Sequence, residues 1–307
     1  MYLRRIAFAA TLILSIPALS FAGDTTSTWQ KNLETWRAQH AAELQAPDSW
    51  LSVVGLDWLD QGTNTVGAAD DNSAQVAGLG VDHLFLLRRQ EGHIRLEPTA
   101  QGFPEGLTVN GKVAVAKELA LGREPDLIRY GTFSFVVIAR GDGFGLRVRN
   151  SNSEERVHFR GLHWYKPDPA YRVTAQWVPY AQTRKVTVQS VVNTTTEGVI
   201  AGEVRFQLHG QQVTLVPVLQ SLEDHALFFV LRDATSKTTT YQASRFLHAD
   251  LPDHGLRSPG TVELDLNKLV NPPCAFTAHA TCPLPIEQNR LAVAIEAGEQ
   301  RYEHAAE

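Results

Sequence analysis

The chain has 307 residues, with 28 Lys and Arg against 33 Asp and Glu, which gives a formal net charge of -5. A mildly acidic chain lacks the basic face that nucleic-acid phosphates require, so we expect no nucleic-acid partner. A hydrophobic content of 43% is ordinary for a globular protein and is enough to build a substantial core.

Residues 1–22 have the pattern of a secretory signal peptide. Arg4 and Arg5 supply positive charge, Ile6 to Leu19 is almost entirely apolar, and Ser20-Phe21-Ala22 provides small residues for cleavage after Ala22. The apolar run is shorter than the roughly 20 residues that a membrane span needs, which disfavours an uncleaved anchor. We therefore predict an exported, soluble protein with no membrane span after cleavage, located in the periplasm if the host is Gram-negative.

One amphipathic helix is predicted at the start of the mature chain, from Ser27 to Leu44. Ser27 can cap its first turn, and Trp29, Leu33 and Trp36 fall near one face together with Leu44. Pro47 follows the helix and prevents it from continuing.

After this helix, short strand patterns and turn signals alternate along the rest of the chain. Asn110-Gly111, between two apolar runs, is the strongest hairpin signal, and Gly141 to Gly145 predicts a second hairpin. The remaining predicted strands include Tyr171 to Val178, Lys185 to Val192, Gly202 to Leu208, Val213 to Leu219, Leu227 to Leu231, Thr239 to Leu247 and Leu291 to Ile295.

This pattern predicts a mainly β fold built from β-sandwich or barrel-like units with the one N-terminal helix. Pro167-Asp168-Pro169 suggests a boundary between two subdomains. We place the helix and a sandwich-like subdomain in residues 23–165, and a C-terminal β subdomain in residues 166–307.

Cys274 and Cys282 are the only cysteines, and they lie in a proline-braced loop. In an exported chain they are predicted to form a disulfide, which would stabilise so small a ring by roughly 2.6 kcal/mol. The alternative is a metal site with His279 between them, but a structural zinc site needs a fourth ligand. His248 to His254 could form a second metal site, but the pattern of this segment favours an irregular loop. We therefore predict no metal.

No nucleotide-binding or hydrolase motif is present, so no cofactor is expected. A set of polar residues in and beside the C-terminal strands could instead line a cleft. Asp265 and Glu299 are the candidate catalytic residues, as a carboxylate pair for acid and base chemistry. The candidate ligand-binding residues are Tyr241, Arg245, Asn267 and Asn271.

The alternative interpretation of this set is structural. Arg245 with Asp233 or Asp265 would form a buried ion pair that fixes strand register. Asn267 and Asn271 would be turn residues whose side chains bond nearby backbone.

At these positions the sequence resembles a bacterial and archaeal family known as domain of unknown function 1684. The matching segments are Asp265-Leu-Asn-Lys, Asn271-Pro-Pro-Cys-Ala-Phe-Thr, Cys282-Pro-Leu-Pro, Asn289-Arg-Leu, Ala297-Gly-Glu, Trp50 to Leu59, Gly145-Leu-Arg-Val-Arg, Asp233-Ala-Thr, Thr240-Tyr and Arg245-Phe-Leu. The resemblance implies no activity. The family pattern has Phe where Leu266 stands and Tyr where His279 stands, which weakens the Cys-His-Cys metal alternative.

Trp50 to Asn72 also resembles the start of a forkhead-associated sandwich, with Gly62 and Gly67 suitably spaced. The phosphothreonine-binding Arg of that pattern is replaced by Ala68 and Ala69, so we infer no phosphopeptide binding. We expect a binding or interaction module of the cell envelope, for a small molecule, a glycan or an envelope protein. The alternative is a hydrolase-like enzyme that uses the carboxylate pair in a C-terminal cleft.

Overall fold

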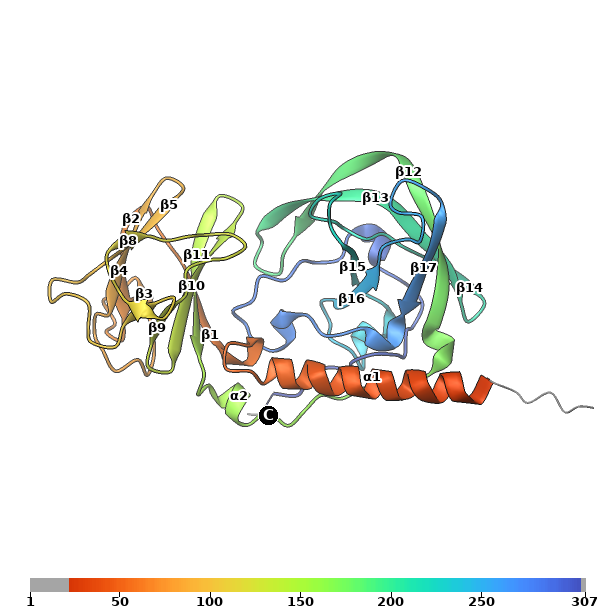
Figure 1. The fold of residues 1–307 in the computed structure, drawn as a ribbon, viewed down its shortest axis with the longest axis horizontal. Coiled ribbons are helices and arrows are strands. Elements are labelled where there is room, and N and C mark those ends of the chain that lie inside the picture. Colours follow the sequence, from red (N-terminus) through yellow and green to blue (C-terminus); the bar gives the residue numbers. More distant parts are fainter. Residues whose placement is uncertain (1–21, 305–307) are drawn as a thin grey trace, which may run out of the picture.

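The computed structural model describes residues 22–304, which form the predicted mainly β protein with one long helix near the N-terminus (Figure 1). The predicted signal peptide, residues 1–22, lies outside the described residues except for Ala22. Within residues 22–304, no helix has both the length and the apolar character needed to cross a membrane.

Helix α1 (Ala22–Leu44) begins earlier than predicted and ends at the predicted residue. The predicted inward face is confirmed, because Leu33 and Leu44 are buried while Trp29 and Trp36 are half-buried. The helix lies along the C-terminal part of the protein (Figure 1). Trp29 Nε1 donates a hydrogen bond to Asp265 Oδ2 at 2.8 Å, across 236 positions of sequence.

The N-terminal part is a β-sandwich of two sheets. One sheet has the strand order β1-β11-β10-β9-β6-β7 and the other the order β3-β2-β4-β5-β8. The rings of Phe85 and Phe135 meet edge to face between the sheets, with centroids 5.3 Å apart. The strands are β1 (Val53–Trp58), β2 (Gly62–Gly67), β3 (Ala74–Gln75), β4 (Phe85–Gln90), β5 (His93–Glu97), β6 (Thr108–Val109), β7 (Lys112–Val113), β8 (Lys117–Glu118), β9 (Ile128–Tyr130), β10 (Phe133–Arg140) and β11 (Gly143–Asn150).

Both hairpins expected in this part are confirmed. Asn110 and Gly111 join β6 to β7 with φ values of 50° and 75°, as a two-residue turn of this type requires. Gly141 and Asp142 join β10 to β11, whose eight residue pairs run from Phe133–Asn150 to Arg140–Gly143.

The C-terminal part contains a four-stranded sheet, of order β14-β13-β12-β17, and the two-stranded sheet β15-β16. Tyr171 to Val178 and Lys185 to Val192, predicted as separate strands, belong to one long strand, β12, with a register irregularity between Pro179 and Arg184. The short helix α2 (Glu154–Val157) precedes this part. The strands are β12 (Arg172–Gln189), β13 (Thr195–Leu208), β14 (Gln211–Leu215), β15 (Ala226–Leu231), β16 (Arg245–Asp250) and β17 (Gly260–Asp265).

Three strand predictions in this part differ from the structure, and the first of them, Val213 to Leu219, ends already at Leu215 in β14. The strand expected from Thr239 begins only at Arg245, and Leu291 to Ile295 forms no strand. The amide of Ile295 donates to the Asp233 side chain at 3.2 Å instead of to a neighbouring strand. Backbone hydrogen bonds do join this segment to residues 232–234, from Leu291 to Arg232 at 2.7 Å and from Ala234 to Val293 at 3.1 Å, but the pairing does not extend into a strand.

Helix α1 and two loops connect the parts. A small apolar cluster combines Leu44 at the helix end, Leu51, and Phe276 and Tyr302 from the C-terminal part. The Thr277 hydroxyl donates to the Val53 carbonyl at 3.0 Å. The sequence prediction places helix α1 in the N-terminal subdomain, residues 23–165. In the structure, however, Trp29 and Arg37 of this helix form hydrogen bonds with the C-terminal part and with Tyr165. The exact subdomain boundary near residue 165 stays a prediction.

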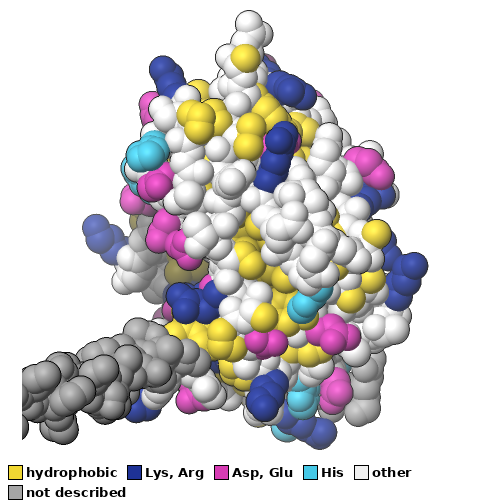
Figure 2. Space-filling view, turned by 90° about the vertical axis from the view of Figure 1, so that its right-hand side faces the viewer, with side chains coloured by type: hydrophobic (Ala, Val, Ile, Leu, Met, Phe, Trp, Pro, Cys, Tyr) yellow, Lys and Arg dark blue, Asp and Glu magenta, His cyan; other side chains and the backbone are white. Residues whose placement is uncertain are grey.

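Figure 2 views the protein from the side of its C-terminal part. Basic and acidic side chains are scattered over this face, and hydrophobic side chains lie between them. The face therefore has no large region of a single charge sign.

Candidate functional site

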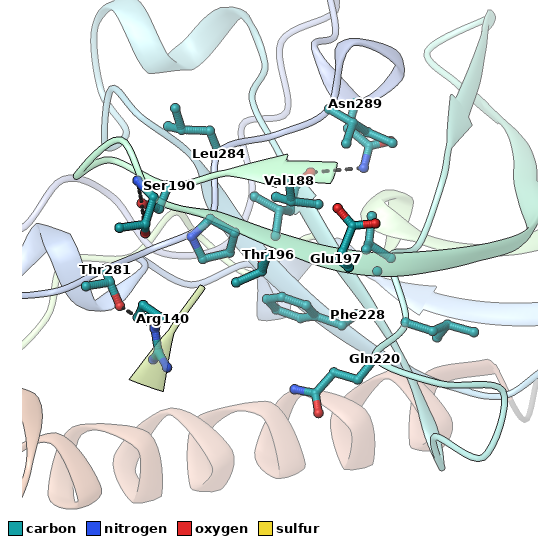
Figure 3. Close-up of a pocket in the computed structure, with 17 residues that line it drawn as sticks. Arg140, Val188, Ser190, Thr196, Glu197, Gln220, Phe228, Thr281, Leu284 and Asn289 are labelled. Carbon is teal, nitrogen blue, oxygen red and sulfur yellow. Dashed lines mark hydrogen bonds between the residues drawn. The ribbon is translucent and has the colours of Figure 1, made fainter. Parts of the chain in front are cut away.

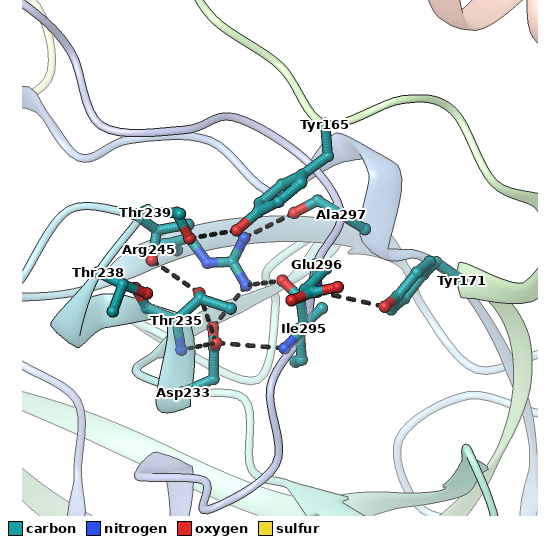
Figure 4. A network of polar contacts seen from close by, with 11 residues as sticks. Tyr165, Tyr171, Asp233, Thr235, Thr238, Thr239, Arg245, Ile295, Glu296 and Ala297 are labelled. Atoms are coloured by element: carbon teal, nitrogen blue, oxygen red, sulfur yellow. Dashed lines mark hydrogen bonds and ion pairs between the residues drawn. The ribbon is translucent and has the colours of Figure 1, made fainter.

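Arg245 and Asp233, two of the polar residues considered for a cleft, form a fully buried ion pair (Figure 4). Arg245 Nη2 lies 2.5 Å from Asp233 Oδ2, and both side chains are 0% exposed. The guanidinium also donates to the carbonyls of Ala297 and Ile295, at 2.6 and 2.9 Å. Asp233 accepts from the amide and hydroxyl of Thr235. The network fastens the 295–297 segment beside β16 and is closed to a ligand.

Asp265 and Asn267 organise a turn at the end of β17. Asp265 Oδ1 accepts hydrogen bonds from the amide of Asn267 and from its Nδ2, at 3.1 and 3.0 Å. The side chain of Asn267 then bonds the Asp168 backbone in both directions, through its oxygen at 3.0 Å and its nitrogen at 2.9 Å. With Trp29 bound to its second oxygen, Asp265 has a structural partner for each carboxylate oxygen.

Glu299 is completely buried, and Asn271 satisfies both of its oxygens. The amide of Asn271 donates to Oε2 at 3.0 Å, and its Nδ2 donates to Oε1 at 2.7 Å. His40 Nε2 from helix α1 lies 3.4 Å from Oε2. A general acid or base must reach its substrate, and neither Glu299 nor Asp265 lines the cavity described below.

The predicted site residues therefore form separate structural groups. Tyr241, half-buried, donates to the Cys274 carbonyl at 2.8 Å. Asn271 joins Glu299, Asn267 joins Asp265, and Arg245 joins Asp233. Nor do three or more His, Cys, Asp or Glu side chains anywhere in residues 22–304 gather in a group that could hold a metal ion.

A cavity of about 530 Å³ lies where the tip of β10 meets the C-terminal part (Figure 3). Strands β12, β13 and β15 and the loop after Cys282 form its walls. Most of its lining is apolar, from Val188, Val218, Leu219, Phe228, Val230, Pro283, Leu284 and Ile286. Its volume lies within the range of roughly 300–1,000 Å³ that is usual for small-molecule sites.

Arg140 is the one cationic side chain of the lining. Its Nε donates to the Thr281 hydroxyl at 2.9 Å and its Nη1 to the Ala139 carbonyl at 2.7 Å. No carboxylate in residues 22–304 lies within ion-pair distance of it. Burial lowers the pKa of Arg140. The side chain is thus a half-buried cation with no counter-charge.

Arg147 is a second cation without a counter-charge on the same sheet. Arg147 pairs with Val136 across β10 and β11, so it shares with Arg140 the face turned away from the sandwich core. It is 6% exposed, stacks over the Trp50 ring at 4.7 Å, and finds no hydrogen-bond partner for Nε or Nη2 among residues 22–304. Burial, followed by the charges of Arg149 and Arg140, lowers the pKa of Arg147 to about 10.

Residues 157–300 match the family model described as a protein of unknown function, DUF1684. The chain belongs to this family. None of the curated proteins matches the sequence.

Three solved structures are similar to parts of this DUF1684 protein. The solution structure of an uncharacterised protein of Haloarcula marismortui is 31% identical over 48% of this chain and 80% of its own, with a TM-score of 0.41. Two structures of forkhead-associated domains are each 22% identical with TM-scores of 0.21. One, in a complex with an intracellular domain of another protein, covers 31% of this chain and 97% of its own. The other, from work on phosphothreonine-dependent interactions, covers 32% and 96%.

The predicted disulfide is not present in the structure. Cys274 and Cys282, which lie in the segment that matches the DUF1684 model, are both free thiols. The Cys282 sulfur instead accepts a hydrogen bond from the Cys274 amide at 3.0 Å. Closeness in sequence brings the two residues together, but a disulfide also needs the sulfurs about 2.05 Å apart with a specific dihedral. The loop here is held by the turn Pro273–Ala275 and by hydrogen bonds.

The two thiols have different environments. The pKa of Cys274 is lowered, chiefly by a hydrogen bond from the Cys282 thiol. Burial opposes this shift, and the Tyr241 hydroxyl adds to it. The hydrogen bond to Cys274, together with burial, raises the pKa of Cys282. Cys274 is also the more exposed of the two residues.

Cys274 is therefore expected to react with iodoacetamide well before Cys282 in the native protein, because the thiolate is the nucleophile. Its rate should reach half of its maximum at a pH below the value of about 8.5 for an ordinary thiol. Peptide mass spectrometry after timed alkylation at several pH values measures both rates. Equal rates in the native protein, or faster labelling of Cys282, would contradict this assignment.

The cavity contains residues that the sequence analysis did not select. Thr281 to Ile286 belongs to the proline-braced loop, which we interpreted as a disulfide loop rather than as a wall. Arg140 ends a hairpin strand and carries no local signal of binding.

Proposed function

We propose that this DUF1684 member is an exported binding protein that takes up a small, largely apolar molecule in the cavity at the tip of β10. The cavity is the observation that carries the proposal, because its volume and its aliphatic lining suit such a molecule. Export is supported by the signal-peptide pattern of residues 1–22.

The lining favours an apolar ligand over a glycan. Sugar hydroxyls lose their water on binding and need hydrogen-bond partners in exchange. The buried polar groups of the cavity are already bonded: Ser190 pairs with Thr194, and the Asn289 amide binds Val216 and Val230 backbone. Phe228, the single aromatic residue of the lining, already packs against Phe246 and His248.

The geometry also favours binding over hydrolysis. Asp265 and Glu299, the carboxylates that could act as acid and base, are held by Trp29, Asn267 and Asn271 outside the cavity lining. The only carboxylate in the lining is Glu197, whose Oε1 accepts a hydrogen bond from the Thr187 hydroxyl at 2.7 Å. One carboxylate does not supply the pair that general acid and base hydrolysis uses.

A neutral apolar fluorophore, N-phenyl-1-naphthylamine, tests the proposal. We expect saturable binding to the purified protein, seen as a rise in fluorescence. Thr196, an exposed residue of the cavity wall on β13, is the position for a blocking variant. Thr196→Trp should weaken binding at least about tenfold, because the indole occupies space that the fluorophore needs.

Gln207→Trp is the matched control, since Gln207 is an exposed residue on the opposite face of the same strand and outside the cavity lining. It should bind the fluorophore as the unchanged protein does. Absence of saturable binding, or equal binding by both variants, would refute a ligand site in this cavity.

A further inference from the structure

We propose that the ligand of this cavity carries an anionic group, of the carboxylate class, that binds Arg140 while its apolar body lies against the aliphatic walls. This inference rests on the proposed function and adds the chemical class of the ligand. The class meant is an amphiphile with one carboxylate and a saturated chain.

The free donors of Arg140 define where the anionic group would bind. Its guanidinium has five N–H groups, and the hydrogen bonds to Thr281 and Ala139 use only two of them. Its Nη2 makes no hydrogen bond within the described residues. The Thr281 hydroxyl accepts from Nε and so holds the planar group in one orientation. A fixed guanidinium with free parallel donors matches a carboxylate.

Arg140 is the positive charge at this end of the cavity, and no carboxylate in residues 22–304 pairs with it. Arg147, on the same sheet face but outside the cavity lining, is a second guanidinium without an ion-pair partner in residues 22–304. Buried cations are ordinarily paired, because removing a charge from water is costly without a counter-charge. A bound carboxylate would supply the missing negative charge.

Glu197 is the one group of the lining that opposes an anion, and its position limits that effect. In Figure 3, Arg140 and Thr281 lie at one end of the labelled residues and Glu197 lies toward the other. Glu197 is exposed to solvent and hydrogen-bonded to Thr187, so water screens its charge. Arg140 is half-buried, so its charge acts through a less polar medium.

The apolar walls specify the other half of the ligand. Val188, Leu219 and Val230 are nearly fully buried and present only aliphatic surface to the cavity. A saturated chain satisfies such walls without leaving polar groups unpaired. Each methylene buried there should tighten binding roughly fourfold, from the transfer free energy of about 0.8 kcal/mol.

Displacement of the bound fluorophore by three ten-carbon probes tests how the charge of the head group affects affinity, because the chain length is the same in all three. The probes are decanoate and decyltrimethylammonium, each below its micelle concentration, and 1-decanol below its solubility limit. We expect decanoate to displace the fluorophore at a concentration about tenfold or more below that of 1-decanol, since hydrogen bonds to charged groups are the stronger ones. Decyltrimethylammonium should be the weakest.

Arg140→Gln should abolish the preference for decanoate over 1-decanol, and Arg140→Lys should retain part of it. Arg123→Gln is the matched control, because it removes one positive charge from an exposed residue outside the cavity lining. It should leave the preference unchanged. Thermal unfolding of each variant confirms that it is folded.

The possible outcomes separate the two proposals. If the fluorophore binds and 1-decanol competes as well as decanoate, the anion inference is wrong while the ligand site stands. The same conclusion follows if Arg140→Gln and Arg123→Gln retain equal preferences for decanoate. If neither the fluorophore nor any ten-carbon probe binds, the proposed function fails and the inference fails with it.

Discussion

Replacing Asp233 with alanine is expected to lower the free energy of unfolding by about 3–5 kcal/mol, the cost of removing one partner of a buried ion pair. Arg245 would then lie in the core with its Nη2 facing no carboxylate, and it is 0% exposed. The amides of Thr235 and Ile295 would lose their acceptor as well. Urea unfolding of the purified variant measures the change.

Asp253→Ala is the matched control. Asp253 accepts from the amide and hydroxyl of Thr261, as Asp233 does from Thr235, but it lies at the surface without a buried cation. Asp253→Ala should lower the free energy of unfolding much less than Asp233→Ala does. The double variant Asp233→Leu/Arg245→Met should regain part of the lost stability, because no charge remains unpaired. If Asp233→Ala and Asp253→Ala lowered the free energy of unfolding equally, the ion pair with Arg245 would add no stability beyond the hydrogen bonds that each Asp accepts from its Thr.

Gly298→Ala is expected to lower the free energy of unfolding by about 2–5 kcal/mol, the sum of two effects. Gly298 has a φ of +82°, a left-handed conformation that costs an L-residue about 1–2 kcal/mol. An added Cβ would also lie 2.5 Å from the Leu269 carbonyl oxygen. Such an overlap in a packed region costs about 1–3 kcal/mol. The same urea titration measures this loss.

Gly210→Ala separates these two effects. Gly210 has a similar φ of +78°, but an added Cβ there would meet no atom within 4 Å. It should show the conformational cost alone, and the difference between the two variants is then the cost of the contact with Leu269. If Gly210→Ala and Gly298→Ala lowered the free energy of unfolding equally, the close contact between the added Cβ and the Leu269 carbonyl would be relieved at no cost.

The features of the fold that could be predicted from sequence depend on local physics. The turn at Asn110-Gly111 is specified by residues that tolerate positive φ, and the face of helix α1 by the spacing of Trp29, Leu33 and Trp36. The segment from Leu291 forms no strand because its backbone pairing with residues 232–234 stops before Ile295, whose amide binds the side chain of Asp233, 62 positions away. Nothing in the local pattern indicates that bond.

The candidate site was harder to predict, for the same reason. The sequence predicts Asp265 and Glu299 as a candidate catalytic pair, but in the structure Trp29 and Asn271 hold the two carboxylates in separate structural groups. The cavity requires Arg140 and Thr281 to meet across 141 positions. Such contacts follow from how a helix, a strand end and loops that are distant in sequence pack together, which strand periodicity does not determine.

The position of helix α1 has a consequence for the order in which the chain assembles. Strands β1 to β11 are contiguous in sequence, so the sandwich can form as soon as residue 150 has been made. The helix precedes them, yet its Trp29 binds Asp265, 236 residues later. Closing so large a loop is slow, and domains generally fold as units as the chain emerges. We therefore expect the first helix of the chain to dock last, and to remain open to chaperones or proteases until the C-terminal part has folded.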